Sequence, residues 1–319
     1  MVQSRRPQQL NLMNIIRTAL IASCLFLVNL PIVSAQKEND LDALLADPEA
    51  EQSKDFVSYT FKSTRIINAH SVEQTPAGVM DMRILHRFGS ISGGAYQLFG
   101  LDQASMRMSL DYGITPWMQV GIGRSSTGKE LDGVLKLRLL RQVAEGSGSP
   151  VTLTYAAGST LSTLAWPEPE RGNFFSSRIA YYHQLLMGKK LNDRLSLQLT
   201  PSLVHRNLVA TRTESNDIFA LGLGGRIKTN ARMALTFDYF MVPGQQLVEH
   251  NNSLSLGIDI ETGGHVFQLH ISNSRGLNER QFITGTNGQW DQGDLFFGFN
   301  LSRVFTLRAP KMPAPVGGW

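Results

Sequence analysis

Apolar and polar residues alternate along short segments of this chain. In the stretch VMDMRILHRFG at 79–89, the apolar positions are Met80, Met82, Ile84 and Phe88, and the charged positions between them are Asp81, Arg83 and Arg87. A period of two is typical of a β-strand whose two faces meet different surroundings. Two structures fit this pattern: a strand on the surface of a soluble sandwich, or a barrel strand with lipid on one face and a wet lumen on the other.

The same alternation recurs from Phe56 onward in segments of about ten residues, separated by turns rich in Gly, Asn, Asp and Pro. Clear cases are found at 104–113, 133–142, 194–204, 231–241, 253–261, 264–272 and 294–305. Helical periodicity never takes over, and the composition does not change in a way that indicates a second domain. The pattern therefore predicts an all-β chain.

The connections between these segments decide between sandwich and barrel. With 79–88 as the first strand, they fall at 89–104, 113–116, 124–131, 142–149, 162–173, 188–193, 206–216, 228–231, 243–252, 262–264 and 274–293. Long and short connections mostly alternate, as in outer-membrane barrels with short periplasmic turns and longer outside loops.

We therefore predict a transmembrane antiparallel up-and-down β-barrel of about 12 strands over 79–305. The long connections 89–104, 162–173, 206–216 and 274–293 are expected outside the cell. The apolar row that contains Met82 then faces hydrocarbon. The charged row that contains Arg83 faces a lumen in which charge costs little, because water is present.

The N-terminus predicts export. A positive region with Arg5, Arg6 and Arg17 precedes the apolar run 19–33, and small residues follow up to Ala35. Residues 1–35 are thus expected to be a signal peptide, and the barrel is expected in the outer membrane of a Gram-negative bacterium. The single cysteine, Cys24, lies in this region, where lipid attachment is the less favoured alternative.

The mature chain then has no thiol chemistry and no disulfide. Loss of three arginines lowers the formal net charge from +4 to +1, so composition gives no indication of nucleic-acid binding. Residues 36–55 are expected to form an acidic flexible linker, and residues 306–319 a Pro/Gly-rich tail.

Residues 56–78 do not fit the strand count. The stretch FVSYTFKSTRIINAH at 56–70, counted as a strand, makes thirteen and inverts the order of long and short connections. It pairs outside the regular barrel, or it enters the lumen as a plug whose Lys62 and Arg65 meet acidic wall residues, or one later strand is assigned wrongly. The sequence leaves these three alternatives open.

The lumen row predicts a stripe of charge, consisting of Arg83, Arg87, Arg107, Asp111, Lys136 and Arg138. We also expect Arg178 and Arg226 to point inward. Opposite charges on neighbouring strands form structural ladders, whereas a basic stripe in a pore favours anions. Both interpretations fit the sequence.

Other chemistry is poorly supported. None of the seven histidines has a Glu or Cys at a metal-ligand spacing, so we expect neither a metal nor a cofactor. An embedded acyl hydrolase would need a serine beside a histidine and a polar orienting residue, and no such set is indicated. The stretch GIGRSSTGK at 121–129 lacks the spacing of a phosphate-binding loop and is expected to end a strand.

Several stretches resemble one family. They are FKSTRIIN at 61–68, HRFG at 86–89, GLD at 100–102, DYGIT at 111–115, GIGRSS at 121–126 and LDGVLKLRLLRQ at 131–142. In this order they resemble the uncharacterised DUF5777 β-barrel proteins of Bacteroidota-type bacteria. The resemblance implies an outer-membrane barrel and carries no catalytic residues. One departure is that Phe305 is followed by a Pro/Gly tail, whereas many barrels end on an aromatic residue.

The sequence thus favours a non-enzymatic barrel that is surrounded by outer-membrane lipid. It is expected to pass or bind small polar or anionic solutes through a charged lumen. A closed structural or partner-binding barrel is the alternative, because twelve strands enclose a lumen that side chains and a plug can block. An acyl hydrolase is the third hypothesis.

Overall fold

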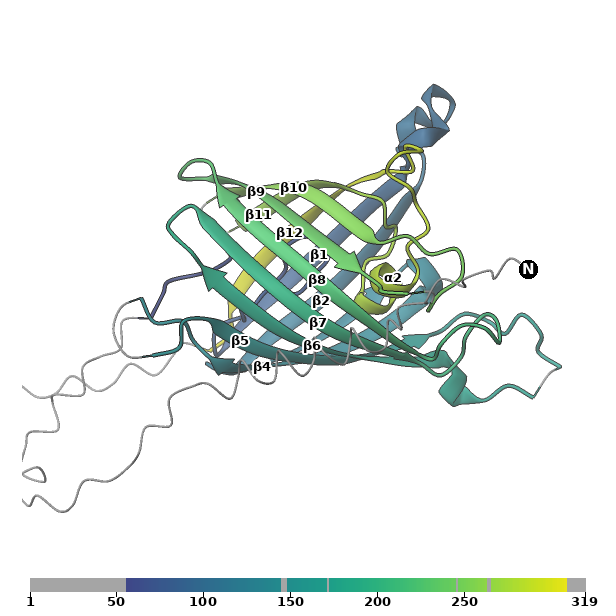
Figure 1. Ribbon diagram of the computed structural model, residues 1–319, viewed down its shortest axis with the longest axis horizontal. Helices are drawn as coiled ribbons and strands as arrows, with labels where there is room; N and C mark the ends of the chain where they lie inside the picture. Colours follow the sequence, from purple (N-terminus) through teal and green to yellow (C-terminus); the bar gives the residue numbers. More distant parts are fainter. Residues whose placement is uncertain (1–55, 145–147, 171, 245, 263–264, 309–319) are drawn as a thin grey trace, which may run out of the picture. The chain divides into compact units, whose positions relative to one another are not determined.

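The computed structural model describes residues 56–144, 148–170, 172–244, 246–262 and 265–308. These residues form a closed barrel of twelve antiparallel strands (Figure 1). The strands are β1 (Val79–Ser90), β2 (Ala104–Thr115), β3 (Met118–Ser125), β4 (Glu130–Leu140), β5 (Thr152–Ser162), β6 (Ile179–Lys190), β7 (Leu195–Arg206), β8 (Asp217–Lys228), β9 (Met233–Met241), β10 (Ser253–Thr262), β11 (His265–Ser272) and β12 (Phe296–Thr306). This architecture confirms the predicted fold.

Each strand pairs with its neighbours in sequence, and β1 closes the sheet by pairing with both β2 and β12. Met80, for example, lies opposite Tyr112 on one side and Phe305 on the other. The helical elements are short: 3₁₀ turns at Ile91–Gly93, Ala95–Gly100, Thr127–Lys129 and Phe175–Arg178, and the helix α2 at Glu279–Thr284. Over the described ranges, no helix is long and apolar enough to span a membrane.

The two faces of the sheet differ as the alternation predicts. Along β1, Asp81, Arg83 and Arg87 point inward and are buried, together with the apolar Leu85, whereas Met82, Ile84 and His86 are partly exposed on the outside. His86 lies on the outer face, where its ring stacks on that of Phe299 at 4.8 Å between centroids. The apolar outer row and the polar inner row are therefore confirmed for this strand.

The two ends of the barrel have different connections. We call the end where β1 begins and β12 ends the base, and the opposite end the rim. The connections at the base include 116–117, 191–194 and 229–232, whereas those at the rim include 91–103, 163–178 and 273–295. The predicted alternation of connection lengths is present, with the longest connections at the rim.

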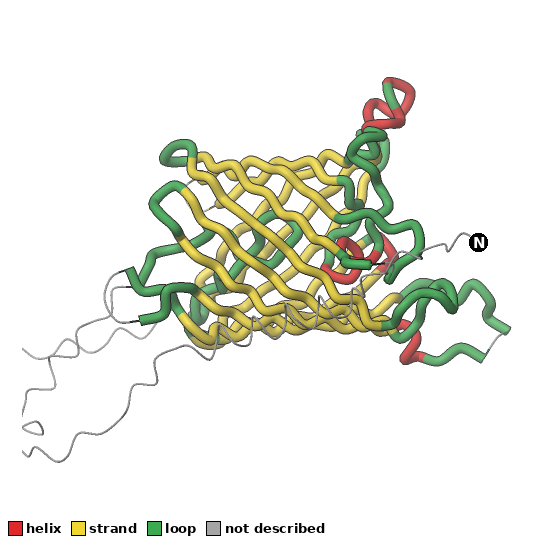
Figure 2. The backbone as a smooth tube through the Cα atoms, viewed as in Figure 1, coloured by secondary structure: helices red, strands yellow, loops and turns green. Residues whose placement is uncertain are grey.

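Two segments fill the lumen (Figure 2). The first is 56–78, here called the inner segment, whose bridge to a barrel strand is the isolated one between Ala77 and Gly113 of β2. The second is the β11–β12 connection 273–295, here called the inner loop, which carries α2 and has a buried run from Leu277 to Ile283 apart from Arg280. Among the residues that the structure describes, 56–70 is not a thirteenth strand of the barrel.

Candidate functional site

The inner segment folds into a tight hairpin inside the barrel. Arg65 and His70 face each other across an antiparallel bridge, and the Ile66 amide donates to the Ala69 carbonyl at 2.9 Å. Residues 66–69 form the tip of this hairpin. Because so few of its backbone groups pair with one another, the others need partners elsewhere in the lumen.

Side chains on the inner row of the barrel supply those partners. At the hairpin tip, Asp238 accepts from the amides of Asn68 and Ala69 at 2.7 and 3.1 Å. Gln268 donates to the Ile66 carbonyl at 2.6 Å, and Asn300 donates to the Ile67 carbonyl at 3.0 Å.

The returning strand of the hairpin is held in the same way. Gln198 accepts from the Val72 amide at 2.8 Å and donates to the His70 carbonyl at 2.7 Å. Thr154 donates to the Val72 carbonyl at 2.9 Å, and Gln119 accepts from the Thr75 amide at 2.8 Å. The wall thus forms a polar cradle for an irregular backbone.

Three cations of the predicted charge stripe belong to this cradle. Arg83 donates to the hydroxyls of Ser63 and Thr64 at 2.9 and 2.8 Å, and it pairs with Asp81 at 2.6 Å. Arg87 donates to the Asn68 side-chain oxygen at 2.7 Å and to the Ser274 carbonyl of the inner loop. Lys136 donates to the carbonyls of Ser71, at 2.8 Å, and Glu73.

Arg107 has a different role. Its guanidinium forms a two-point ion pair with Asp132, with distances of 2.9 Å from Nε to Oδ1 and 2.5 Å from Nη2 to Oδ2. Arg107 lies on β2 and Asp132 on β4, so the pair crosses the intervening strand β3. Gly123 of β3 makes this possible, because a Cβ at that position would lie only 2.5 Å from Arg107 Nη2.

The remaining predicted residues lie nearby. Asp111 is buried on β2 opposite Asp81. Arg138 is half-buried toward the base, 3.9 Å from Glu73, and Lys62 pairs with Glu261 of β10 at 3.3 Å. Lys62 thus makes the contact with an acidic wall residue that the plug alternative expected.

At the centre of the lumen the inner segment meets the inner loop. Arg65 Nη1 lies 2.9 Å from Glu279 Oε1, and the two side chains are 2% and 1% exposed. We call these two residues the central ion pair. Arg65 was expected to meet the barrel wall, but its acidic partner comes from the α2 helix instead.

His70 adjoins the central ion pair. Its Nε2 lies 3.1 Å from Glu279 Oε1 and 3.3 Å from both Arg65 Nη2 and the Tyr182 hydroxyl. Burial, followed by the positive charges of Arg65 and Lys136, lowers the pKa of His70 well below its usual value. His70 is therefore neutral at neutral pH.

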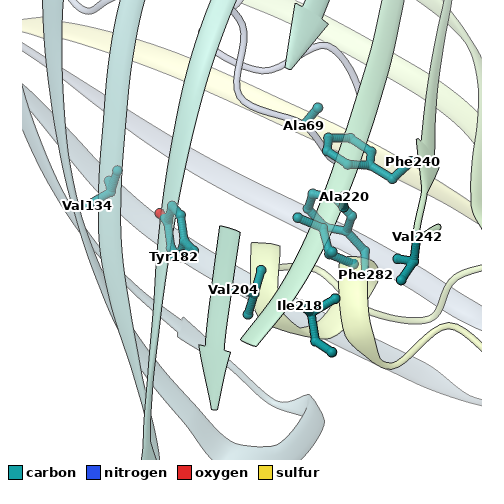
Figure 3. Close-up of a cluster of buried hydrophobic side chains, with 10 residues drawn as sticks. Ala69, Val134, Tyr182, Val204, Ile218, Ala220, Phe240, Val242 and Phe282 are labelled. Carbon is teal, nitrogen blue, oxygen red and sulfur yellow. The ribbon is translucent and has the colours of Figure 1, made fainter. Parts of the chain in front are cut away.

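Apolar side chains pack around these polar contacts (Figure 3). Ala69 at the hairpin tip and Phe282 of α2 belong to one cluster with Phe240 of β9, and the two phenylalanine rings are 5.0 Å apart in an edge-to-face arrangement. Val72 and Leu186 belong to a second cluster. The hairpin is thus held by packing as well as by hydrogen bonds.

Two expectations from the sequence are wrong. The lumen row was expected to face water, but Arg83 and Arg87 are at most 1% exposed because the inner segment covers them. Arg178 was expected on the inner wall, but it lies in the turn before β6, where it donates to the Ser162 carbonyl and stacks on Trp166. Arg226 does point inward and pairs with Glu261 at 2.8 Å.

Sequence reasoning placed Asp238, Gln198 and Asn300 on the inner row without a binding role, and it missed Gln268 and, on the inner loop, Glu279. The alternation places the wall residues on the inner row but gives no indication of what they bind. The stretch ERQFIT at 279–284 carried a signal, because apolar residues inside a predicted outside loop indicate burial. Over the described ranges, no group of three or more His, Cys, Asp or Glu side chains is arranged to hold a metal ion.

Comparison with solved structures finds other barrels at low similarity. The chain shares 8% identity with the NanC porin in a rhombohedral crystal form (TM-score 0.42, covering 70% of this chain and 98% of that one). It shares 8% identity with the OmpF of Salmonella typhi in complex with daunomycin (TM-score 0.37, covering 71% of this chain and 97% of that one). It shares 9% identity with Omp33 of Acinetobacter baumannii (TM-score 0.36, covering 71% of this chain and 97% of that one). Among curated protein sequences, none matches.

A family model provides the assignment that those structures do not. It is described as a membrane-bound β-barrel domain (DUF5777) and matches residues 61–305, which include most of the inner segment as well as the barrel. The resemblance seen in the sequence is thereby confirmed, and the chain belongs to the DUF5777 family of membrane-bound β-barrels.

Proposed function

We propose that this protein is a non-enzymatic channel of the bacterial outer membrane that is closed at rest by its own inner segment. It passes small polar solutes, anions among them, when the hairpin leaves the lumen. The observation that carries this proposal is the polar cradle, in which wall side chains bond an irregular backbone.

The chemistry of the cradle supports a reversible closure. A wall-to-hairpin hydrogen bond contributes only about 0.5–1.5 kcal/mol net between neutral groups and about 1.5–3 kcal/mol when one group is charged, because water replaces the lost partner on both sides. Gln198, Gln268 and Asn300 would hydrate readily in an emptied lumen, and the barrel sheet itself would keep all its backbone pairing. A purely structural filling would gain more from apolar contacts, which water cannot replace.

The charge stripe supports a place for anions among the solutes. No salt bridge in the described parts of the chain involves Arg87 or Lys136, whose partners come largely from the inner segment and the inner loop. Departure of the hairpin would leave both cations facing the passage. Asp111 and Asp238 would oppose them, so we expect a moderate preference for anions and not a strict filter.

The second candidate is a permanently closed structural barrel. The buried central ion pair and the Phe240–Phe282 contact favour it, because both tie the contents of the lumen together. The two candidates differ in whether the lumen ever opens.

Single-channel recording in planar bilayers separates them. We expect brief, rare openings from the mature protein and sustained conductance from a chain that lacks residues 36–78. Replacing Arg87 and Lys136 together with Gln in the shortened chain should shift the reversal potential in a salt gradient toward cations. Absence of any current from a folded shortened barrel would refute passage and leave the closed structural barrel.

A further inference from the structure

A cavity of about 260 Å³ opens at the rim, apart from the hairpin and its cradle. It lies between the rim ends of β4 to β7 and the inner loop. Its charged lining residues are Glu130, Arg178, Arg206 and Arg280, and its apolar lining includes Leu164, Trp166, Ile179 and Leu208. The volume is below the roughly 300–1,000 Å³ of pockets for drug-sized ligands, so only a small molecule fits.

The charges around this rim cavity leave a surplus of one positive charge. Arg206 pairs with Glu214 at 3.0 Å, and Arg280 pairs with Glu130. Arg178 donates to the carbonyls of Ser162 and Leu164, and none of the described carboxylates forms an ion pair with it.

One of the arginines that line this cavity carries an unmet hydrogen-bond donor. The Nε of Arg206 is buried without a partner, and Arg206 as a whole is 9% exposed. A buried donor without an acceptor costs about 1–3 kcal/mol, which an anionic oxygen at this position would recover. The guanidinium of Arg178 lies 3.9 Å from the centre of the Trp166 ring, which holds it at the edge of an apolar wall.

We propose that the rim cavity binds a small organic monocarboxylate with an apolar body. A guanidinium matches the geometry of a carboxylate, the surplus of one positive charge matches a monoanion, and Trp166 with its apolar neighbours matches an uncharged body. An inorganic phosphate dianion would satisfy the cations but would leave the apolar wall unused.

The position of the cavity connects it with the proposed passage. Arg280, which lines the cavity, directly follows Glu279 of the central ion pair in α2. A carboxylate in the cavity competes with Glu130 for Arg280. Binding at the rim does not require the lumen to open. The inference rests on the proposed function in one respect, because it names small monocarboxylates as a class of solute for the proposed channel.

Isothermal titration calorimetry of the full mature protein in detergent, with benzoate as the probe, tests the site. We expect saturable binding of benzoate, and binding at least tenfold weaker for benzamide, which has a similar shape and no charge. Arg178→Gln should weaken benzoate binding roughly 10- to 100-fold, the range for a lost hydrogen bond to a charged group. The matched control is Arg212→Gln, which removes an exposed charge from the neighbouring 207–216 connection and should leave binding unchanged.

Three results would overturn the proposal: no binding of benzoate, equal binding of benzamide, or equal loss in the two arginine variants. Inorganic phosphate binding as tightly as benzoate would overturn the apolar part of the assignment. Because no conductance is measured, a failure here leaves the proposed channel untouched, and a silent channel leaves this site untouched.

Discussion

The central ion pair should determine how firmly the hairpin stays in the lumen. Arg65→Gln would leave the Glu279 carboxylate without its closest cation while it remains 1% exposed. Removing one partner of a buried pair typically costs about 3–5 kcal/mol. At 1.36 kcal/mol per tenfold change, the population with the hairpin outside the lumen should rise roughly 10²- to 5 × 10³-fold.

Thiol labelling in a Val72→Cys background measures that population. Val72 is fully buried against the wall, and the sequence has no other cysteine besides Cys24 of the predicted signal peptide. A maleimide therefore reaches position 72 only when the hairpin moves out, and the labelling rate follows the open fraction.

Lys62→Gln is the matched control, because it removes the same charge three residues away. Lys62 is 39% exposed and pairs with Glu261 near the base, a contact worth about 0–1 kcal/mol, so labelling should accelerate at most about fivefold. Equal labelling rates in the Arg65 and Lys62 variants would refute the idea that the central ion pair holds the hairpin.

Three further predictions concern the wall and the pH dependence. Leu197→Arg on the outer row should lower the free energy of unfolding in lipid by about 2–4 kcal/mol, whereas Leu197→Met should change it by less than about 1.5 kcal/mol. Equal effects of the two variants in urea titrations would contradict a lipid-facing row. Gly123→Ala should lower the free energy of unfolding by about 1–3 kcal/mol, because the new Cβ displaces Arg107 from Asp132. Gly133→Ala should leave it nearly unchanged, because the nearest atom to its new Cβ is 3.9 Å away. The same urea titrations compare the two variants. Burial lowers the pKa of His70, so below about pH 6.5 the released inner segment binds a proton that the segment in the lumen does not. The free energy that holds the segment in the lumen should therefore be largest above about pH 6.5 and decrease below it. Labelling at position 72, normalised to the unfolded protein at each pH, should accelerate on acidification, and His70→Asn should reduce that acceleration.

Much of the barrel could be predicted from the sequence because strand alternation is a local property. The outer position of Met82 and the inner position of Arg83 follow from their neighbours alone. The predicted even number of strands brings both ends of the barrel to one side, where β12 can pair antiparallel with β1. What the wall encloses could not be predicted in this way.

The contents of the lumen depend on contacts between distant parts of the chain. Arg65 and Glu279 are 214 residues apart, and no local pattern connects them. A plug formed by 56–70 was one of three open alternatives, and the inner loop was predicted to lie outside. Because neither was assigned to the lumen, Arg87 and Lys136 were expected in water and are buried instead.

A covalent tether between the hairpin and the wall tests whether solutes pass only when the hairpin leaves the lumen. A Cβ at Gly188 of β6 would lie 3.4 Å from the Val72 Cβ, close to the roughly 3.5–4.5 Å between the Cβ atoms of a disulfide. The double variant Val72→Cys/Gly188→Cys can therefore tether the hairpin to the wall under oxidising conditions.

Single-channel recording of this double variant in planar bilayers, before and after addition of a reductant, provides the comparison. We expect no openings while the disulfide is intact and openings like those of the unmodified protein once it is reduced, with both single-cysteine variants insensitive to the reductant. Equal currents from the oxidised and the reduced double variant would show that solutes pass with the hairpin still in the lumen.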